Sequence, residues 1–182
     1  IEGCLKAGIY PMVGDTAIET FLTDNLEVLK EKNADGIAFI KPWENDAIIS
    51  KMKLAEDAGV FALGVDVDAC GLVTLSLHGK NVEPKTLDKI KELKKATKLP
   101  FILKGLMTVD EAILAAEAGV DAIVVSNHGG RVLDCTPGAA DVLPAIAKAV
   151  KGKTIILADG GVRTGVDVLK LIALGADGVL IG

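Results

Sequence analysis

Seven short runs of apolar residues recur along the chain, separated by segments whose apolar positions have helical spacing. The runs are rich in β-branched residues and almost free of polar positions, as in strands that are covered on both faces. They span residues 9–13, 37–40, 60–67, 101–104, 122–126, 154–158 and 178–181. Alternating strands and helices predict a parallel sheet with right-handed crossovers, and so many units favour an α/β (β/α)8 TIM barrel over an open sheet.

The segments between the runs carry helix boundary signals. Small residues such as Ala58-Gly59 and Ala118-Gly119 stand where a helix ends and a strand follows. Thr108 and Glu111 have the spacing of a capping box, which predicts a helix beginning just beyond Lys104-Gly105. In a barrel of this type the chemistry lies at the carboxyl ends of the strands. Polar residues that close an apolar run are therefore the candidate site residues.

The length and composition of the chain limit the possible folds. The chain has 182 residues, of which 50% are hydrophobic and only 3% aromatic, so its core is built from aliphatic side chains. A closed barrel usually takes about 250 residues. The chain also begins at Ile1 without a methionine and stops at Gly182 directly after an apolar run. We therefore expect residues 1–182 to form a single barrel domain that is truncated at both ends, and to be unstable and inactive in isolation.

The charged and sulfur-containing residues exclude several classes of function. The 20 basic residues are scattered among 25 acidic ones, for a net charge of −5, which argues against binding to nucleic acid or to an anionic membrane. No apolar run approaches the roughly 18 residues of a membrane span. Cys4, Cys70 and Cys135 lie far apart, so we expect free thiols in a cytoplasmic protein rather than a disulfide or a zinc site.

Three strand ends carry charged side chains. Lys104 would place an ammonium at the barrel mouth, where it can stabilise negative charge, although a solvated lysine is the alternative. His128 and Arg131 flank two glycines and combine a base that works near neutral pH with a group that binds carboxylates bidentately. Asp66 and Asp68 would share one side of a strand, and either can orient an imidazole unless it caps the following loop.

Two further strand ends are candidates for ligand contacts. Asp159-Gly160-Gly161-Val162-Arg163 is a strand end and glycine turn before a helix, which predicts a phosphate site, with Gly182 closing the last strand beside it. Trp43 either forms the wall of a planar ligand site or covers the rim of the barrel.

These blocks resemble the FMN-dependent α-hydroxy acid oxidases and dehydrogenases of the lactate and glycolate oxidase type. The likeness is dense from about residue 100 onward and thin before it. It is carried by Phe101-Ile102-Leu103-Lys104-Gly105, by Ser126-Asn127-His128-Gly129-Gly130-Arg131, and by Asp159-Gly160-Gly161-Val162-Arg163-Thr164-Gly165. The resemblance implies FMN as cofactor, a small 2-hydroxy acid as substrate, oxygen or another electron acceptor, a homo-oligomer, and a chain that matches strands 2 to 8 of the family's barrel.

The resemblance also implies a role for each matching residue. His128 would be the base, Asp68 its support, Arg131 the carboxylate ligand, and Trp43 a substrate contact. The residues expected at the flavin are Lys41, Asp66, Lys104, Ser126, Asp159, Gly160, Gly161, Val162, Arg163 and Gly182.

The chain departs from the family at several positions. The family's glutamine appears as Lys41, its flavin-contacting threonine as Asp66 and its tyrosine as Trp43, and a second carboxylate-binding arginine is absent after Asp68. The missing arginine motivates one alternative, a non-catalytic flavin-binding protein. The other alternative is another FMN-barrel enzyme, such as a type 2 isopentenyl diphosphate isomerase-like protein, in which the region around Gly160-Gly161-Val162-Arg163 is similar.

Overall fold

The structure is a computed structural model that describes all residues from 1 to 182, and its centre is one parallel sheet. Seven strands pair in sequence order from β1 to β7. They are β1 (Met12–Gly14), β2 (Ile37–Ile40), β3 (Ala62–Asp66), β4 (Phe101–Leu106), β5 (Ala122–Val125), β6 (Ile155–Ala158) and β7 (Gly178–Val179). All seven predicted strands are present.

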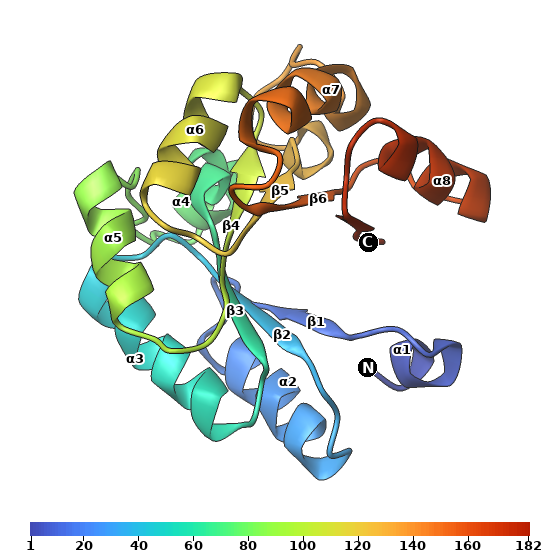
Figure 1. Ribbon diagram of the computed structural model, residues 1–182. Helices are drawn as coiled ribbons and strands as arrows, with labels where there is room; N and C mark the ends of the chain where they lie inside the picture. The colour runs from blue at the N-terminus through green and yellow to red at the C-terminus, as the bar shows by residue number, and fades with distance from the viewer.

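Helices connect the strands and cover one face of the curled sheet (Figure 1). They are α1 (Glu2–Ala7), α2 (Glu19–Glu31), α3 (Asn45–Asp57), α4 (Val73–Leu77), α5 (Leu87–Lys95), α6 (Val109–Glu117), α7 (Ala139–Val150) and α8 (Gly165–Ala173), with short 3-10 turns η1 (Val67–Gly71) and η2 (His128–Gly130). The helix α6 begins as predicted, because Thr108 and Glu111 form a complete capping box. None of the helices is both long and apolar enough to cross a membrane.

The sheet curls into an open barrel. Its edge strands β1 and β7 do not pair with one another, and both chain termini lie on the open side (Figure 1). Sequential order with parallel pairing throughout is the topology of a TIM barrel. The expected fold, an incomplete (β/α)8 barrel, is therefore confirmed.

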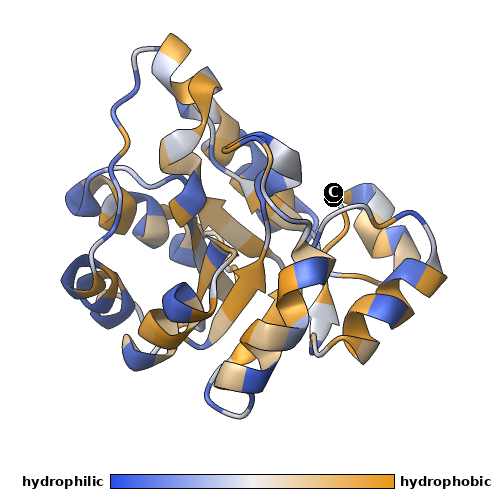
Figure 2. Cartoon of the chain, turned by 90° about the horizontal axis from the view of Figure 1, so that it is seen from above, coloured by the Kyte–Doolittle hydropathy of each residue, from blue (hydrophilic) through white to orange (hydrophobic).

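Two hydrophobic cores follow from the alternation of side chains along the strands. The larger core lies between the sheet and the helices and includes Leu63, Val65 and Leu103. The smaller one fills the inside of the barrel with residues such as Phe39, Ile102 and Val124. In Figure 2 the strands are hydrophobic along most of their length, whereas the surrounding helices alternate between hydrophobic and hydrophilic. The inner core covers only the lower part of the barrel and leaves the mouth to polar side chains.

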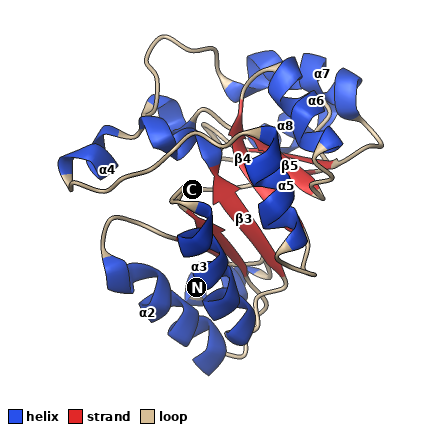
Figure 3. Cartoon of the chain, turned by 90° about the vertical axis from the view of Figure 1, so that its left-hand side faces the viewer, coloured by secondary structure: helices blue, strands red, loops and turns tan.

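Several boundaries differ from the sequence prediction. The first strand begins at Met12 rather than residue 9, because α1 ends at Gly8 in a left-handed conformation and Ile9 and Tyr10 remain exposed. The third strand stops at Asp66, and the chain turns at once into η1. The segment after η1 carries α4 away from the layer of helices on the sheet (Figure 3).

Candidate active site

The polar side chains of the mouth come from the carboxyl ends of β3 to β6. Asp66 and Lys104 are register partners in adjacent strands, and both point to the inside of the barrel. Ser126 and Asp159 follow directly after β5 and β6. Parallel strands bring these ends to one edge of the sheet, as the sequence predicted.

A histidine and a carboxylate pair at this edge. The Nδ1 atom of His128 lies 3.0 Å from Oδ2 and 3.2 Å from Oδ1 of Asp68. Both side chains are nearly buried, with exposed fractions of 8% and 10%. Because Nδ1 faces the carboxylate, the proton on the neutral ring is assigned to Nδ1, and Nε2 remains as the basic atom.

Asp68 reaches this position from η1 rather than from a strand. The expectation that Asp66 and Asp68 share one side of a strand is wrong, because β3 ends at Asp66 and the 3-10 turn redirects the chain. The two carboxylates therefore serve different partners. Asp66 points into the barrel, whereas Asp68 contacts His128.

Gly105 makes the approach of Asp68 possible. Its φ angle is +101°, and a Cβ built there would lie 2.2 Å from Cγ of Asp68. No side chain fits such a gap, and an L-residue would be strained at this φ angle. The bulge between β4 and β5 at this position thus gives the Asp68 carboxylate its place.

The loop after β5 holds His128 through short local bonds. Asn127 Oδ1 accepts hydrogen bonds from the amides of Gly129 and Gly130, and Ser126 Oγ accepts one from the amide of His128. His128 itself adopts a φ angle of +57°, which is uncommon for a residue with a side chain. The following glycines also have positive φ angles, so this sequence can form the tight turn that presents the imidazole.

Arg131 is exposed and is held at one end only. Its Nε donates to the carbonyl oxygen of His128 at 3.0 Å, whereas no hydrogen bond or ion pair engages its terminal amino groups. A guanidinium in this state can bind a planar carboxylate with two parallel hydrogen bonds. The structure thus places a free anion-binding group beside the imidazole.

Lysines and aspartates alternate across the inside of the mouth. Lys41 Nζ lies 2.6 Å from Asp66 Oδ2, and Lys104 Nζ lies 3.6 Å from both Asp66 Oδ1 and Asp159 Oδ2. Lys104 also donates to Ser126 Oγ at 3.2 Å. These five side chains, predicted separately from the sequence, form one contiguous cluster.

The glycine loop after β6 presents backbone groups to solvent. Gly160 and Gly161 have φ angles of +103° and +69°, and at Gly161 no neighbouring atom lies within 4 Å of a built Cβ. Val162 is buried beneath the loop, whereas Arg163 is exposed and donates to the carbonyl of Val162. Gly182 is exposed at the last described position. No hydrogen bond or ion pair joins Arg163 to the lysine and aspartate cluster.

The start of α8 differs from the predicted anion site. The Asp167 carboxylate accepts hydrogen bonds from the amides of Arg163 and Thr164, and these bonds hold its pKa below the usual range. An ionised side chain therefore already occupies this helix terminus. The groups left for a phosphate are the amides of the glycine turn and the Arg163 guanidinium.

Trp43 packs at the rim, and its partner Asp15 is a residue whose importance sequence analysis missed. The indole Nε1 donates to the buried Asp15 carboxylate, which also accepts from the Lys41 amide and from Lys51 Nζ. The ring belongs to the core between sheet and helices. This arrangement favours the rim-covering alternative, and a substrate contact for Trp43 stays a prediction. An aspartate that directly follows Gly14 at a strand end was the only available signal for the Asp15 cluster.

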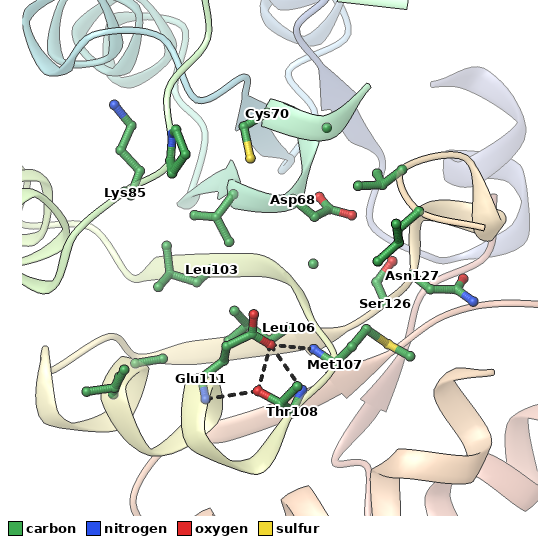
Figure 4. Close-up of a pocket in the computed structure, with 18 of the residues that line it drawn as sticks. Asp68, Cys70, Lys85, Leu103, Leu106, Met107, Thr108, Glu111, Ser126 and Asn127 are labelled. Carbon is green, nitrogen blue, oxygen red and sulfur yellow. Dashed lines mark hydrogen bonds between the residues drawn. The ribbon is translucent and has the colours of Figure 1, made fainter. Parts of the chain in front are cut away.

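A large cavity lies behind Asp68, between the sheet and helices α5 and α6. It has a volume of about 740 Å³ and is lined by Leu103 and by residues of α5 and α6. Figure 4 shows Asp68 and Cys70 on one wall and Leu106 on the other. Burial raises the pKa of the Cys70 thiol there. The lining includes Ser126 but neither Lys104 nor Asp66, so this cavity meets the cluster at the mouth only at Ser126.

A family model described as FMN-dependent dehydrogenase matches residues 73–182. The chain belongs to this family. The resemblance inferred from the sequence is thereby confirmed, and so is the cofactor class that the family uses.

Relatives and solved structures of FMN-dependent hydroxy acid enzymes match parts of the chain. A peroxisomal (S)-2-hydroxyacid oxidase of Arabidopsis thaliana is 49% identical over 119 residues, which are 65% of this chain and 31% of that protein. An L-lactate oxidase of Lysinibacillus sphaericus is 51% identical over 105 residues, which cover 57% of this chain and 27% of the relative. A mandelate oxidase structure aligns with a TM-score of 0.84 at 30% identity, over 98% of this chain and 57% of that one. The matched segment thus spans about a third of these curated relatives.

The mouth fits the cofactor of the FMN-dependent dehydrogenases. Asp66 Oδ1 is a buried acceptor without a hydrogen-bond partner, and it faces the barrel interior beside Lys104. The glycine turn at Gly160 and Gly161 leaves open space around its backbone, as close approach of a phosphate requires. Lys41, Asp66 and Lys104 are the residues that would hold the flavin ring, and the glycine turn with Arg163 would hold its phosphate.

Proposed function

We propose that the protein oxidises a small 2-hydroxy acid to the corresponding 2-oxo acid with bound FMN. The observation that carries this proposal is the His128–Asp68 pair at the barrel mouth, together with the free Arg131 guanidinium and the Lys104 ammonium, which Ser126 links to the same loop. A base, a carboxylate ligand and a cation for developing negative charge are the groups that this reaction needs.

His128 is the proposed base. Its Nε2 would take a proton from the substrate, while Asp68 keeps the ring oriented and stabilises the imidazolium that results. When bound, the flavin supplies the redox chemistry by accepting the electron pair of the substrate. Lys104, anchored through Ser126, would stabilise the negative charge that arises at the cofactor edge.

Arg131 is the proposed substrate anchor. Its free amino groups would bind the carboxylate and place the hydroxyl-bearing carbon near His128 Nε2. Neither hydrogen bonds nor ion pairs bring a second arginine to this position. A carboxylate held by one arginine in place of two loses about 1.5–3 kcal/mol of binding free energy, so we expect weak binding of the smallest substrates unless their side chains add contacts.

Anaerobic flavin reduction tests the function directly. The full-length protein is purified, its flavin spectrum is recorded, and lactate, glycolate and longer 2-hydroxy acids are added without oxygen. We expect bleaching of the flavin absorbance, with the rates ranking the substrates. A bound flavin that resists every 2-hydroxy acid would contradict the proposal and support a flavin-binding protein or another FMN-barrel enzyme, and absence of flavin would contradict all three.

The two histidines of the chain provide a matched pair of variants. His128→Ala should lower the rate of bleaching by about 10²–10⁴-fold, because general base catalysis is worth that much, and should leave the flavin bound. His78→Ala changes an exposed histidine at the end of α4 and should alter neither property. Loss of flavin from the His128→Ala variant would contradict the assigned role.

Acceptor, assembly and location complete the proposal. We propose oxygen or another electron acceptor for the reduced flavin, a homo-oligomer of the full-length protein, and a cytoplasmic location, the last on the three unpaired cysteines. Reoxidation rates under air, size-exclusion chromatography with light scattering, and imaging of a tagged protein test these points in turn.

A further inference from the structure

One carboxylate oxygen at the barrel mouth lacks a hydrogen-bond donor. Oδ2 of Asp66 accepts from Lys41 Nζ at 2.6 Å, but the buried Oδ1 has no hydrogen-bond partner, and it is the only buried side-chain polar atom of the chain in this state. The Lys104 ammonium lies 3.6 Å away, beyond hydrogen-bond distance. Buried acceptors are almost always paired, so an unpaired one that faces a binding site indicates a donor on the ligand.

The surroundings of Asp66 define the shape of that ligand. Asp66 lies two residues beyond Gly64 on the inner face of β3, and a Cβ built on Gly64 would lie 2.3 Å from the ring of Phe39. The ring therefore lies across Gly64 and forms an apolar floor beneath the carboxylate. Two ammonium groups, those of Lys41 and Lys104, flank Asp66. The protein thus offers one acceptor, the Asp66 carboxylate, between two donors, the lysine ammonium groups. The complementary ligand is a flat edge on which one N–H group lies between two carbonyl oxygens.

We propose that Asp66 Oδ1 accepts the imide N3–H of the flavin ring and that Lys41 is the buried counterion that keeps Asp66 ionised and oriented. The oxidised isoalloxazine ring has a single N–H, the imide between two carbonyl groups. This inference rests on the proposed binding of FMN and assigns a function to the ion pair between Lys41 and Asp66 at the flavin site. Where the family resemblance led us to expect a neutral glutamine and threonine, this chain recognises the imide with a full charge.

The charge of Asp66 also acts on the neighbouring lysine. A cation near the ring favours its reduced, anionic form, and a carboxylate 3.6 Å from Lys104 offsets part of that effect. Lys41 in turn offsets Asp66. Removing one member of the pair should therefore shift the reduction equilibrium of the flavin in one direction, and removing the other should shift it in the opposite direction.

The first test uses a flavin that lacks the imide proton. Apoprotein prepared from the full-length holoenzyme is titrated with FMN and with 3-methyl-FMN, and the dissociation constants are read from quenching of flavin fluorescence. We expect FMN to bind at least tenfold more tightly, because a hydrogen bond to a charged acceptor is lost with the analogue. In the double variant Lys41→Met/Asp66→Ala, which removes both charges together, the ratio should fall below threefold.

The outcomes separate this inference from the function on which it rests. Apoprotein that binds neither flavin contradicts the proposed function. Apoprotein that binds both flavins equally, or a double variant that retains the full preference, overturns the role of Asp66 while the proposed function stands.

The second test measures reduction potentials of the flavin-loaded protein at pH 8 against a reference dye. Asp66→Asn should make the potential more positive and Lys41→Met should make it more negative, each by at least a tenfold change in the reduction equilibrium, about 30 mV for a two-electron couple. Lys80→Met breaks the exposed ion pair with Glu19 and should leave the potential unchanged. Shifts of the same sign, or no shift in either variant, overturn the proposal. A purely structural role does not predict that the two variants shift the reduction potential in opposite directions.

Discussion

The two halves of the barrel mouth differ in how their charged side chains are bonded. In the first half, from β1 to β3, each charged group is bonded to the protein itself: Asp15 accepts from two side chains and two backbone amides, and Lys41 is paired with Asp66. In the second half, from β4 to β6, Arg131 and Arg163 bond only to backbone carbonyls through their side chains. The first half is thus mainly a scaffold, in which Asp66 Oδ1 is the one buried acceptor left unpaired, and the second half presents two arginines that are free for ligands.

The family relationship follows the same division. The matched segment begins at residue 73 and contains Lys104, His128, Arg131 and Arg163, whereas Asp15, Lys41 and Asp66 lie before it. The departures from the expected residues, Lys41 and Asp66, also lie in the first half. A site can therefore keep the lysine, histidine and arginines of one half while the other half changes its bonding, provided that the charges within that half remain balanced.

Asp15→Ala should have the largest effect and should act on folding. The substitution removes a fully buried carboxylate and leaves Lys51 and the Trp43 indole without their partner, which should lower the free energy of unfolding by about 3–5 kcal/mol. Urea unfolding of the full-length protein, with exposed Asp24→Ala as the control, measures this difference. Normal stability of Asp15→Ala would break the description of the first half as a scaffold.

Gly105→Ala should affect catalysis more than folding. The new Cβ would displace Asp68 from His128, and a misplacement of about 1 Å can lower a rate by about 10²-fold. We expect the maximal rate of flavin reduction to fall by that order, with little change in substrate KM or in bound flavin. Gly119→Ala is the control, because its φ angle of +77° is also positive but no neighbouring atom lies within 4 Å of the added Cβ. Equal rate losses in both variants would mean that strain alone is responsible.

The two arginines of the chain sharpen the comparison within the second half. Arg131→Ala should raise the KM for 2-hydroxy acids about tenfold to a hundredfold, the value of a charged hydrogen-bonded pair, and leave FMN affinity unchanged. Arg163→Ala should have the opposite effect: it should weaken the binding of FMN and leave the KM for the substrate unchanged. Titration of apoprotein with FMN and initial rates against substrate concentration separate the two. A variant in which both quantities change together would show that the two sites are not independent.

Sequence analysis predicted the features that depend on local pattern. Each strand was visible because a strand covered on both faces needs a continuous apolar run, and the start of α6 was visible in Thr108 and Glu111. The membership of Lys104, Ser126 and Asp159 in one cluster followed from the rule that parallel strand ends meet at one edge.

The remaining features depend on contacts between distant segments. Nothing in the run from residue 60 to 67 reveals that the chain leaves the strand at Asp66. The pairing of Asp68 with a histidine 60 residues away was expected only from the family resemblance. The Asp15 cluster joins residues 26 to 36 positions apart, and Asp167 occupies its helix terminus through bonds that local sequence permits but does not require. Tertiary packing decides such pairings.

Glu83→Gln should have the smallest effect, although Glu83 contacts the first half through the bond from its amide to the Pro42 carbonyl. Its carboxylate accepts hydrogen bonds from Lys85 and Lys89, which lower its pKa to about 2. Lys85 Nζ also donates to the Trp43 carbonyl oxygen. A carboxyl group whose pKa is lowered by folding stabilises the folded state at pH values above its pKa in the unfolded chain. This contribution is lost as the pH falls through the pKa of the folded state. The variant should thus lower the urea midpoint slightly at pH 7 and less at pH 3, whereas exposed Glu27→Gln should not. The effect is small because Glu83 is screened by solvent, as Asp15 is not. A loss as large as that of Asp15→Ala would show that the scaffold depends on partly exposed ion pairs as much as on buried ones.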